Sequence, residues 1–171
     1  MNATALSSSA NTRRAYKAIL WAGLIAGTLD ITAAIVISAF RGTMPIKVLQ
    51  SVASGFLGAA SYEGGLKTAL LGLGLHFVIA TGAATVFYFL STMFRFLVRQ
   101  AIISGIIYGV AVYLFMNFVV LPLSAFPQGA PVPISRRIIG LLVIIFCVGL
   151  PISLVVRHFS KVWSRTSTVP L

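Results

Sequence analysis

Two residues inside long apolar stretches, Asp30 and His76, have side chains that could do chemistry. Asp30 precedes Arg41, which places its carboxyl group roughly 16 Å below one end of its helix, and His76 follows Lys67 by roughly 14 Å. Because the two depths match on consecutive antiparallel helices, we expect a buried Asp30–His76 polar pair. Such a pair can relay a proton or bind an ion or a substrate. The alternative is a single polar contact that fixes the register of two helices.

Three further polar side chains complete the candidate site. A carboxylate at the middle of a membrane costs about 2.5–3.5 kcal/mol, so Asp30 must be protonated, hydrated or paired. Thr28 and Thr32 lie close to it in the sequence and are expected to donate hydrogen bonds. Asn117, roughly 8 Å from the outer end of its own stretch, is expected to bond to a neighbouring helix.

Other chemistries find no support in the sequence. The one cysteine, Cys147, cannot form an internal disulfide, and no His, Cys and carboxylate residues have the spacing of metal ligands. The chain contains no G-x-S-x-G nucleophile motif and no glycine-rich phosphate loop. We therefore expect no catalytic residues, no metal and no cofactor.

The composition identifies the elements that must hold these residues. Only 9% of the residues are charged, 58% are hydrophobic and the mean hydropathy is +1.01, whereas soluble domains have about 25% charged residues. These values exclude a soluble enzyme, a disordered chain and a disulfide scaffold. Four stretches reach the length of about 20 apolar residues that a spanning helix needs: 18–40, 66–90, 101–121 and 138–156. The predicted fold is all-α, a bundle of four transmembrane helices over residues 18–157, because lipid leaves backbone groups no partners outside the segment.

The basic residues predict an orientation. The chain has 13 Lys and Arg against two acidic residues, and most of the bases flank the apolar stretches. One side of the bundle carries Arg13, Arg14, Lys17, Arg95, Arg99, Arg157, Lys161 and Arg165, and the other carries Arg41, Lys47, Lys67, Arg136 and Arg137. Cytoplasmic loops are the richer in Lys and Arg, so both termini are expected in the cytoplasm, within a disordered basic segment 1–17 and a basic tail 158–171. These bases are not stacked with aromatic residues, so the expected partner is the lipid bilayer and not nucleic acid.

The outer connections differ from plain loops. Residues 45–60 are expected to form an amphipathic helix that lies in the outer interface or dips back into the bundle. Its apolar residues are Ile46, Leu49, Val52, Ala53, Phe56 and Leu57, and its polar residues are Lys47, Gln50, Ser51 and Ser54. The second outer connection, 122–135, holds four prolines and is expected to be extended and stiff.

Glycine pairs at helical spacing indicate close helix packing. Gly23 and Gly27 in the first span, like Gly105 and Gly109 in the third, place small residues on one helix face, and the second span adds Gly72, Gly74 and Gly82. The same glycine faces could instead form the interface of a homo-oligomer. A shift of 82 residues superposes the two glycine pairs and sets Pro45 on Pro127, but three coincidences of Gly and Pro in apolar helices do not by themselves indicate two related halves.

Several of these segments resemble a known family. Gly23-Leu-Ile-Ala-Gly27, Leu75-His76-Phe77, Gly105-Ile-Ile-Tyr-Gly109 and Phe118-Val-Val-Leu-Pro-Leu123 are similar to segments of the YagU-like family and of related four-helix proteins of the bacterial inner membrane. The likeness covers residues 18–157. It implies a four-helix fold and a location in the inner membrane, and no activity is established for the family that could be carried over.

Two functions fit the sequence. The first is a non-enzymatic integral membrane protein, an assembly or stress-related component that forms a homo-oligomer or binds another membrane protein, with the Asp30–His76 pair in its core. The second is a small transporter or a proton or ion pathway that uses the same pair. A lipid-modifying enzyme would need further polar residues converging on His76.

Overall fold

The computed structural model describes residues 3–127 and 132–166, and all regular elements in that part are helices. Four of its helical segments are long and apolar enough to cross a membrane: Thr12–Ala39, Gly65–Met93, Ala101–Leu123 and Ile134–Ser160. The four predicted spans are therefore confirmed as helices of spanning length and composition, which indicates an integral membrane protein.

The element order follows the predicted hairpins. The first hairpin consists of α1 (Ala3–Ala39), α2 (Pro45–Leu57), the 3₁₀ turn η1 (Gly58–Tyr62) and α3 (Gly65–Met93). The short helix α4 (Arg95–Arg99) leads to the second hairpin. That hairpin consists of α5 (Ala101–Phe115), η2 (Met116–Val120), α6 (Leu121–Leu123), α7 (Ile134–Val143), η3 (Ile144–Gly149) and α8 (Leu150–Thr166).

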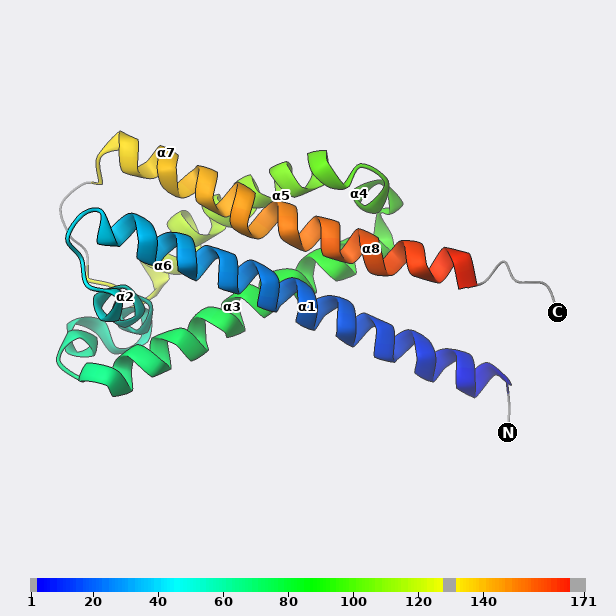
Figure 1. Ribbon diagram of the computed structural model, residues 1–171, viewed down its shortest axis with the longest axis horizontal. Coiled ribbons are helices and arrows are strands. Elements are labelled where there is room, and N and C mark those ends of the chain that lie inside the picture. Colours follow the sequence, from blue (N-terminus) through cyan, green and yellow to red (C-terminus); the bar gives the residue numbers. More distant parts are fainter. Residues whose placement is uncertain (1–2, 128–131, 167–171) are drawn as a thin grey trace.

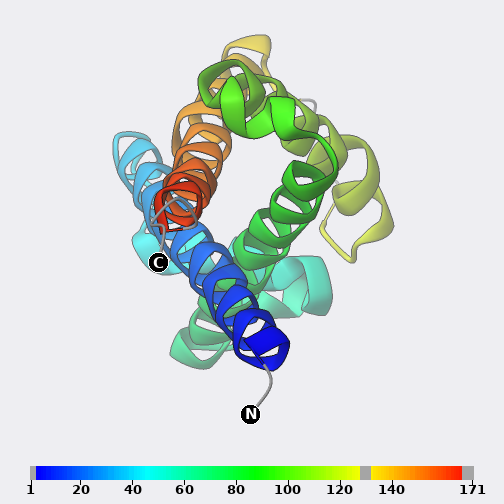
Figure 2. The ribbon, with the colours of Figure 1, turned by 90° about the vertical axis from the view of Figure 1, so that its right-hand side faces the viewer.

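The four spans run side by side along the long axis of the molecule (Figure 1). Helix α1 packs on α3 and on η3–α8, and η3–α8 packs in turn on α5. The helices therefore contact one another in the order α3, α1, α8, α5, and Figure 2 shows α1 and α8 next to each other. The start of α1, the end of α8 and α4 lie at one end of the bundle, which we call the terminal end (Figure 1). Helix α2 and the start of α7 lie at the opposite end, which we call the α2 end.

The core is built from small residues, and large apolar residues face outward. Ala22, Ala26 and Ala84 are fully buried and pack with Phe87 and Ile152. Large side chains on the outer faces are highly exposed, among them Leu66, Val78, Ile107 and Phe118. A soluble protein would bury such side chains, whereas lipid solvates them and leaves close packing of small residues as the force between helices.

The glycine pairs pack within the chain. A Cβ atom added to Gly23 would lie 2.7 Å from Thr81 Oγ1, and one added to Gly27 would lie 2.9 Å from the Phe77 ring, both on α3. The faces that could have formed a homo-oligomer interface are therefore covered by the chain's own second span. Gly105 and Gly109 contact η3 and α8 in the same way.

Helix α2 (Pro45–Leu57) forms within the predicted range 45–60, and η1 follows it. It buries polar and apolar side chains together: Gln50 and Ser54 are buried, as are Val48 and Ala53, whereas Phe56 is 74% exposed. Gln50 Nε2 donates hydrogen bonds to Gly65 O (3.0 Å) and Thr68 Oγ1 (3.3 Å) of α3. A polar side chain that finds partners on α3 is more stable inside than in an apolar environment, which explains why Gln50 lies inside. Seen nearly end-on while the spans run across the view, α2 lies crosswise at its end of the bundle (Figure 1).

Two spans contain π-helical segments, η2 and η3, and each ends two residues before a proline, Pro122 and Pro151 respectively. Proline has no N–H, and its ring clashes with the carbonyl group four residues earlier. Widening the preceding turn relieves this clash, and π segments are often found at functional sites.

The structure corrects the predicted termini and the proline-rich connection. Residues 3–17, predicted to be disordered, continue α1, because no proline or glycine interrupts them. Residues 158–166 of the tail continue α8, and residues 167–171 lie outside the described part. Pro122 is helical rather than extended, whereas Pro133 is extended, with φ −54° and ψ 145°. Residues 128–131 of this connection lie outside the described part.

Candidate functional site

Asp30 lies in a pocket of about 310 Å³ between α1, the third span and α7. The carboxyl group is half-buried on α1 and contributes to the lining of this pocket. We call this cavity the Asp30 pocket. The other lining residues that matter here are Ser38, Arg41, Tyr113, Asn117, Arg136 and Ile144.

The predicted direct pair between Asp30 and His76 is not formed. His76 Nε2 donates a hydrogen bond to the carbonyl oxygen of Gly27 at 2.8 Å, about one turn before Asp30 on α1. The carboxylate and the imidazole are close enough to interact electrostatically. Within the described residues, however, Asp30 has no hydrogen bond and no ion-pair partner within 4 Å. Helices α1 and α3 lie close together at Gly27. The His76 ring therefore reaches the backbone carbonyl of Gly27 more readily than it reaches the Asp30 carboxylate.

The prediction that Thr28 and Thr32 donate hydrogen bonds to Asp30 is wrong. Both threonines are exposed, and neither bonds to Asp30 in the described part of the structure. Residues two positions apart on a helix point to nearly opposite sides, so neither threonine can face the pocket together with Asp30.

Asn117 lies in the pocket, although not by the predicted contact. Its Nδ2 donates to the carbonyl oxygen of Tyr113 at 2.9 Å, one turn earlier in the same span, and not to a neighbouring helix. Asn117 belongs to the π segment η2, and Ile144 of the second π segment lines the same pocket. The widened turns of two spans therefore flank Asp30.

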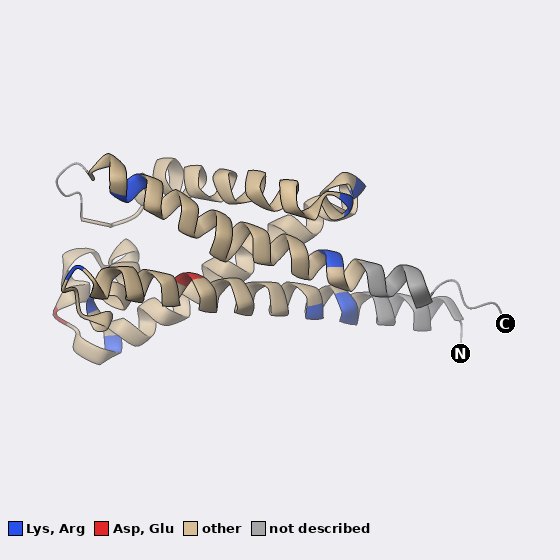
Figure 3. Ribbon diagram, turned by 45° about the horizontal axis from the view of Figure 1, so that its top comes forward, with Lys and Arg blue, Asp and Glu red and all other residues tan. Residues whose placement is uncertain are grey.

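Two arginines line the pocket nearer the α2 end of the molecule. Arg41 follows the last turn of α1, and Arg136 lies in the first turn of α7. The sequence places both at helix ends but gives no sign that they share a cavity with Asp30. Figure 3 shows the basic residues of the described part toward the two ends of the bundle, not in its middle.

A buried apolar cluster lies between the Asp30 pocket and the terminal end. Ala22, Ala26, Phe87, Val148 and Ile152 belong to one apolar cluster of α1, α3, η3 and α8. Tyr108 ties the third span to this cluster, because its hydroxyl donates to Ala83 O at 2.6 Å and its ring lies edge-on to Phe87 at 5.0 Å. Apolar side chains therefore lie between the Asp30 pocket and the terminal end.

The arrangement can bind a proton or a small polar ligand at a carboxylate deep in the bundle. His76 lies beside this pocket on α3, where its ring hydrogen-bonds to the Gly27 carbonyl of α1. Among the described residues, no three His, Cys, Asp or Glu side chains gather as a metal site requires.

Known proteins add no further information on this site. No protein-family model, curated protein or solved structure matches the chain. The resemblance to the YagU-like family therefore stays a prediction, and the functional argument depends on the geometry of the site.

Proposed function

We propose that this protein is a non-enzymatic membrane protein that carries protons, with Asp30 as the group that takes the proton from the α2 end. One observation carries the proposal: a carboxylate in the middle of a spanning helix lines a pocket without a hydrogen bond or ion-pair partner among the described residues. We further propose that the terminal end is cytoplasmic, as the distribution of Lys and Arg favours.

The alternative, a carboxylate that only fixes helix register, requires a partner. Its cost of about 2.5–3.5 kcal/mol at the middle of the membrane is offset when it accepts hydrogen bonds from a neighbouring helix. His76 bonds instead to the Gly27 carbonyl, so the register of α1 and α3 is held without the carboxylate. Asp30 is then explained better as a binding group than as a structural contact.

The side chains around Asp30 favour a proton over a metal cation. Arg41 and Arg136 line the same pocket and repel any cation that approaches it, a proton included. A single carboxylate is enough to bind a proton, whereas a metal ion requires several ligands, and no three His, Cys, Asp or Glu side chains gather among the described residues. The pocket volume of about 310 Å³ leaves room for water molecules.

The apolar cluster favours a carrier over an open channel. The buried cluster around Phe87 and Ile152 consists of apolar side chains and lies between Asp30 and the terminal end, which favours transfer by a shift of the helices over a continuous open path. Release to the terminal end therefore requires the helices to shift, and we infer that His76, at a similar depth on α3, exchanges the proton with Asp30.

Proton flux into liposomes tests the proposal. The purified protein is reconstituted with a pH-sensitive dye inside the vesicles, and a potassium diffusion potential drives uptake. We expect Asp30→Asn to reduce the initial rate by tenfold or more, since Asn cannot bind the proton, on the order of the contribution of other proton-transfer groups. The matched control is Glu63→Gln, which removes the chain's other, exposed carboxylate outside the spans.

Equal flux in the native protein and in Asp30→Asn would contradict the proposal. Absence of flux in both would contradict it as well, and lower stability of the variant would then assign Asp30 to the bundle's structure. Infrared spectroscopy gives a second readout: we expect a carboxyl C=O band that changes with pH and is missing in Asp30→Asn.

A further inference from the structure

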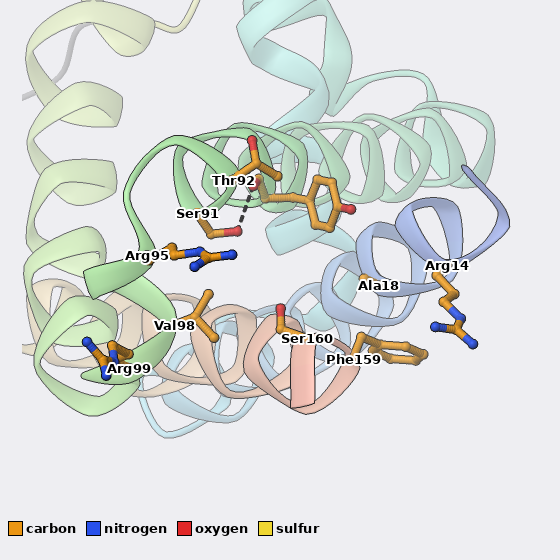
Figure 4. A pocket seen from close by; sticks show the side chains of 10 residues that line it. Arg14, Ala18, Ser91, Thr92, Arg95, Val98, Arg99, Phe159 and Ser160 are labelled. Carbon is orange, nitrogen blue, oxygen red and sulfur yellow. Dashed lines mark hydrogen bonds between the residues drawn. The ribbon is translucent and has the colours of Figure 1, made fainter. Parts of the chain in front are cut away.

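A second pocket, of about 650 Å³, lies at the terminal end, away from Asp30. It is formed by residues of α1, α3, α4 and α8, which meet where the spans end. We call it the arginine pocket, because Arg14, Arg95 and Arg99 line it. Arg95 points into the space between Ser91 and Ser160, with Arg14 and Arg99 on opposite sides (Figure 4).

The chain provides no acidic side chain to balance these three charges. Its two acidic residues are Asp30, in the middle of the first span, and Glu63, at the α2 end. In the described part of the structure, none of the three arginines has a hydrogen bond or an ion pair. Guanidinium groups have five N–H donors each and prefer carboxylate and phosphate partners, so these arginines are available to bind an external anion.

The remaining donors of the pocket narrow the chemistry of that anion. The hydroxyls of Ser91, Thr92 and Ser160 donate to carbonyl groups of their own helices at 2.7–2.9 Å. The donors left to a ligand are the guanidinium groups and the Tyr88 hydroxyl. Such a set suits an anion with several acceptor oxygens, and a phosphate group has this form.

The surroundings of the pocket favour a lipid as the source of the phosphate. Phe94 and Phe96, which flank Arg95, are more than half exposed, as expected of a short helix that lies at the surface of the bilayer. Phe159 and Val98 give the pocket an apolar wall beside the arginines. Basic pockets between the ends of spanning helices bind anionic head groups in this way.

We propose that the arginine pocket binds the phosphate head group of an anionic phospholipid from the leaflet at the terminal end. The guanidinium group of Arg95 binds the phosphate, Arg14 and Arg99 at the two edges of the pocket add positive charge, and the wall formed by Phe159 and Val98 contacts the upper part of the lipid. This proposal does not depend on proton binding at Asp30, because the two pockets share no lining residue and the apolar cluster lies between them.

Thermal unfolding of the purified protein in detergent tests the proposal. Dioctanoyl phosphatidylglycerol, dioctanoyl phosphatidylcholine and inorganic phosphate are titrated separately. We expect phosphatidylglycerol to raise the melting temperature of the native protein at concentrations about tenfold lower than phosphatidylcholine. In Arg95→Gln the half-maximal concentration of phosphatidylglycerol should rise by about tenfold, as expected for the loss of a charge-assisted hydrogen bond.

Arg137→Gln is the matched control, because it removes the same charge from an exposed position at the α2 end. Equal loss of phosphatidylglycerol binding in both variants would overturn the proposal, since it would indicate a response to net charge alone. Stabilisation by inorganic phosphate that phosphatidylglycerol does not exceed would overturn the lipid source. Arg14→Gln provides the same test on another helix should Arg95→Gln not fold.

Discussion

At the scale of single residues, Asp30 and His76 play different parts although they lie near each other. The imidazole of His76 links α3 to α1 through the Gly27 carbonyl, which is a structural contact. The carboxylate of Asp30 lines a pocket and, among the described residues, links nothing. An ionisable side chain without a bonding partner in an apolar span is a candidate for function.

This difference predicts opposite effects on stability. Asp30→Leu removes an ionisable group that has no bonding partner in the structure, so we expect the free energy of unfolding to rise by about 1–3 kcal/mol. His76→Leu removes a hydrogen bond between helices and should lower it by about 1 kcal/mol. Reversible unfolding in mixed micelles measures both values. A loss of stability in Asp30→Leu comparable to that in His76→Leu would show that Asp30 has a structural role after all.

At the scale of elements, close contact between backbones determines how the spans pair. Gly149 of η3 contacts the backbone of Gly105 and Gly109 on α5, and Gly72 of α3 contacts the backbone of α2 at Leu49. At these positions any side chain would force the helices apart. Other glycines of the same spans face open space, so glycine content alone does not identify a contact.

Gly149→Ala should therefore separate the third and fourth spans. A Cβ atom at this position would lie 2.7 Å from the Gly109 nitrogen, and we expect unfolding free energy to fall by about 1–3 kcal/mol. Gly74→Ala is the control, because an added Cβ atom there meets nothing within 4 Å. The control should stay within about 1 kcal/mol of the native protein. Unfolding in mixed micelles compares the two, and equal stability would contradict the packing argument.

Helix α2 illustrates how environment decides which face of an element is inside. The alternation of polar and apolar residues is visible in the sequence, and the helix forms where it is expected. Gln50 is nevertheless buried and Phe56 exposed. Lipid solvates an apolar face as well as the protein core does, so burying that face gains little. A polar side chain, by contrast, gains hydrogen bonds when it is buried against another helix.

At the scale of the whole molecule, the two hairpins use glycine in corresponding ways. Gly23 and Gly27 of the outgoing helix α1 pack on the returning helix α3, and Gly105 and Gly109 of α5 pack on η3 and α8. The two hairpins therefore share this use of glycine. Each pocket lies toward one end of the bundle with the apolar cluster between them, an arrangement compatible with access from alternate sides.

The orientation of the molecule can be tested with single cysteines in a Cys147→Ala background. Thr43→Cys lies at the α2 end and Gln100→Cys at the terminal end, and both native side chains are exposed. We expect a membrane-impermeant maleimide to label Thr43→Cys in right-side-out vesicles and Gln100→Cys in inside-out vesicles. The reverse pattern would invert the proposed orientation, and labelling of both from one side would contradict a span between them.

The sequence by itself determined the four helices, their approximate bounds and the depth of Asp30 and His76. These properties depend on local composition and on the constant rise of a helix, which need no knowledge of the other spans. The sequence also identified Gly23, Gly27 and Gly105 as small residues suited to close packing.

Only the tertiary structure decided which side chains meet. Depth along an axis does not give rotation about it, so the sequence could not show that His76 meets the Gly27 carbonyl or that Thr28 faces away from Asp30. Arg41 and Arg136 are far apart in the chain, and their common pocket depends on how α1 and α7 pack. The rotation and pairing of helices arise from contacts along their whole length, and no single segment contains that information.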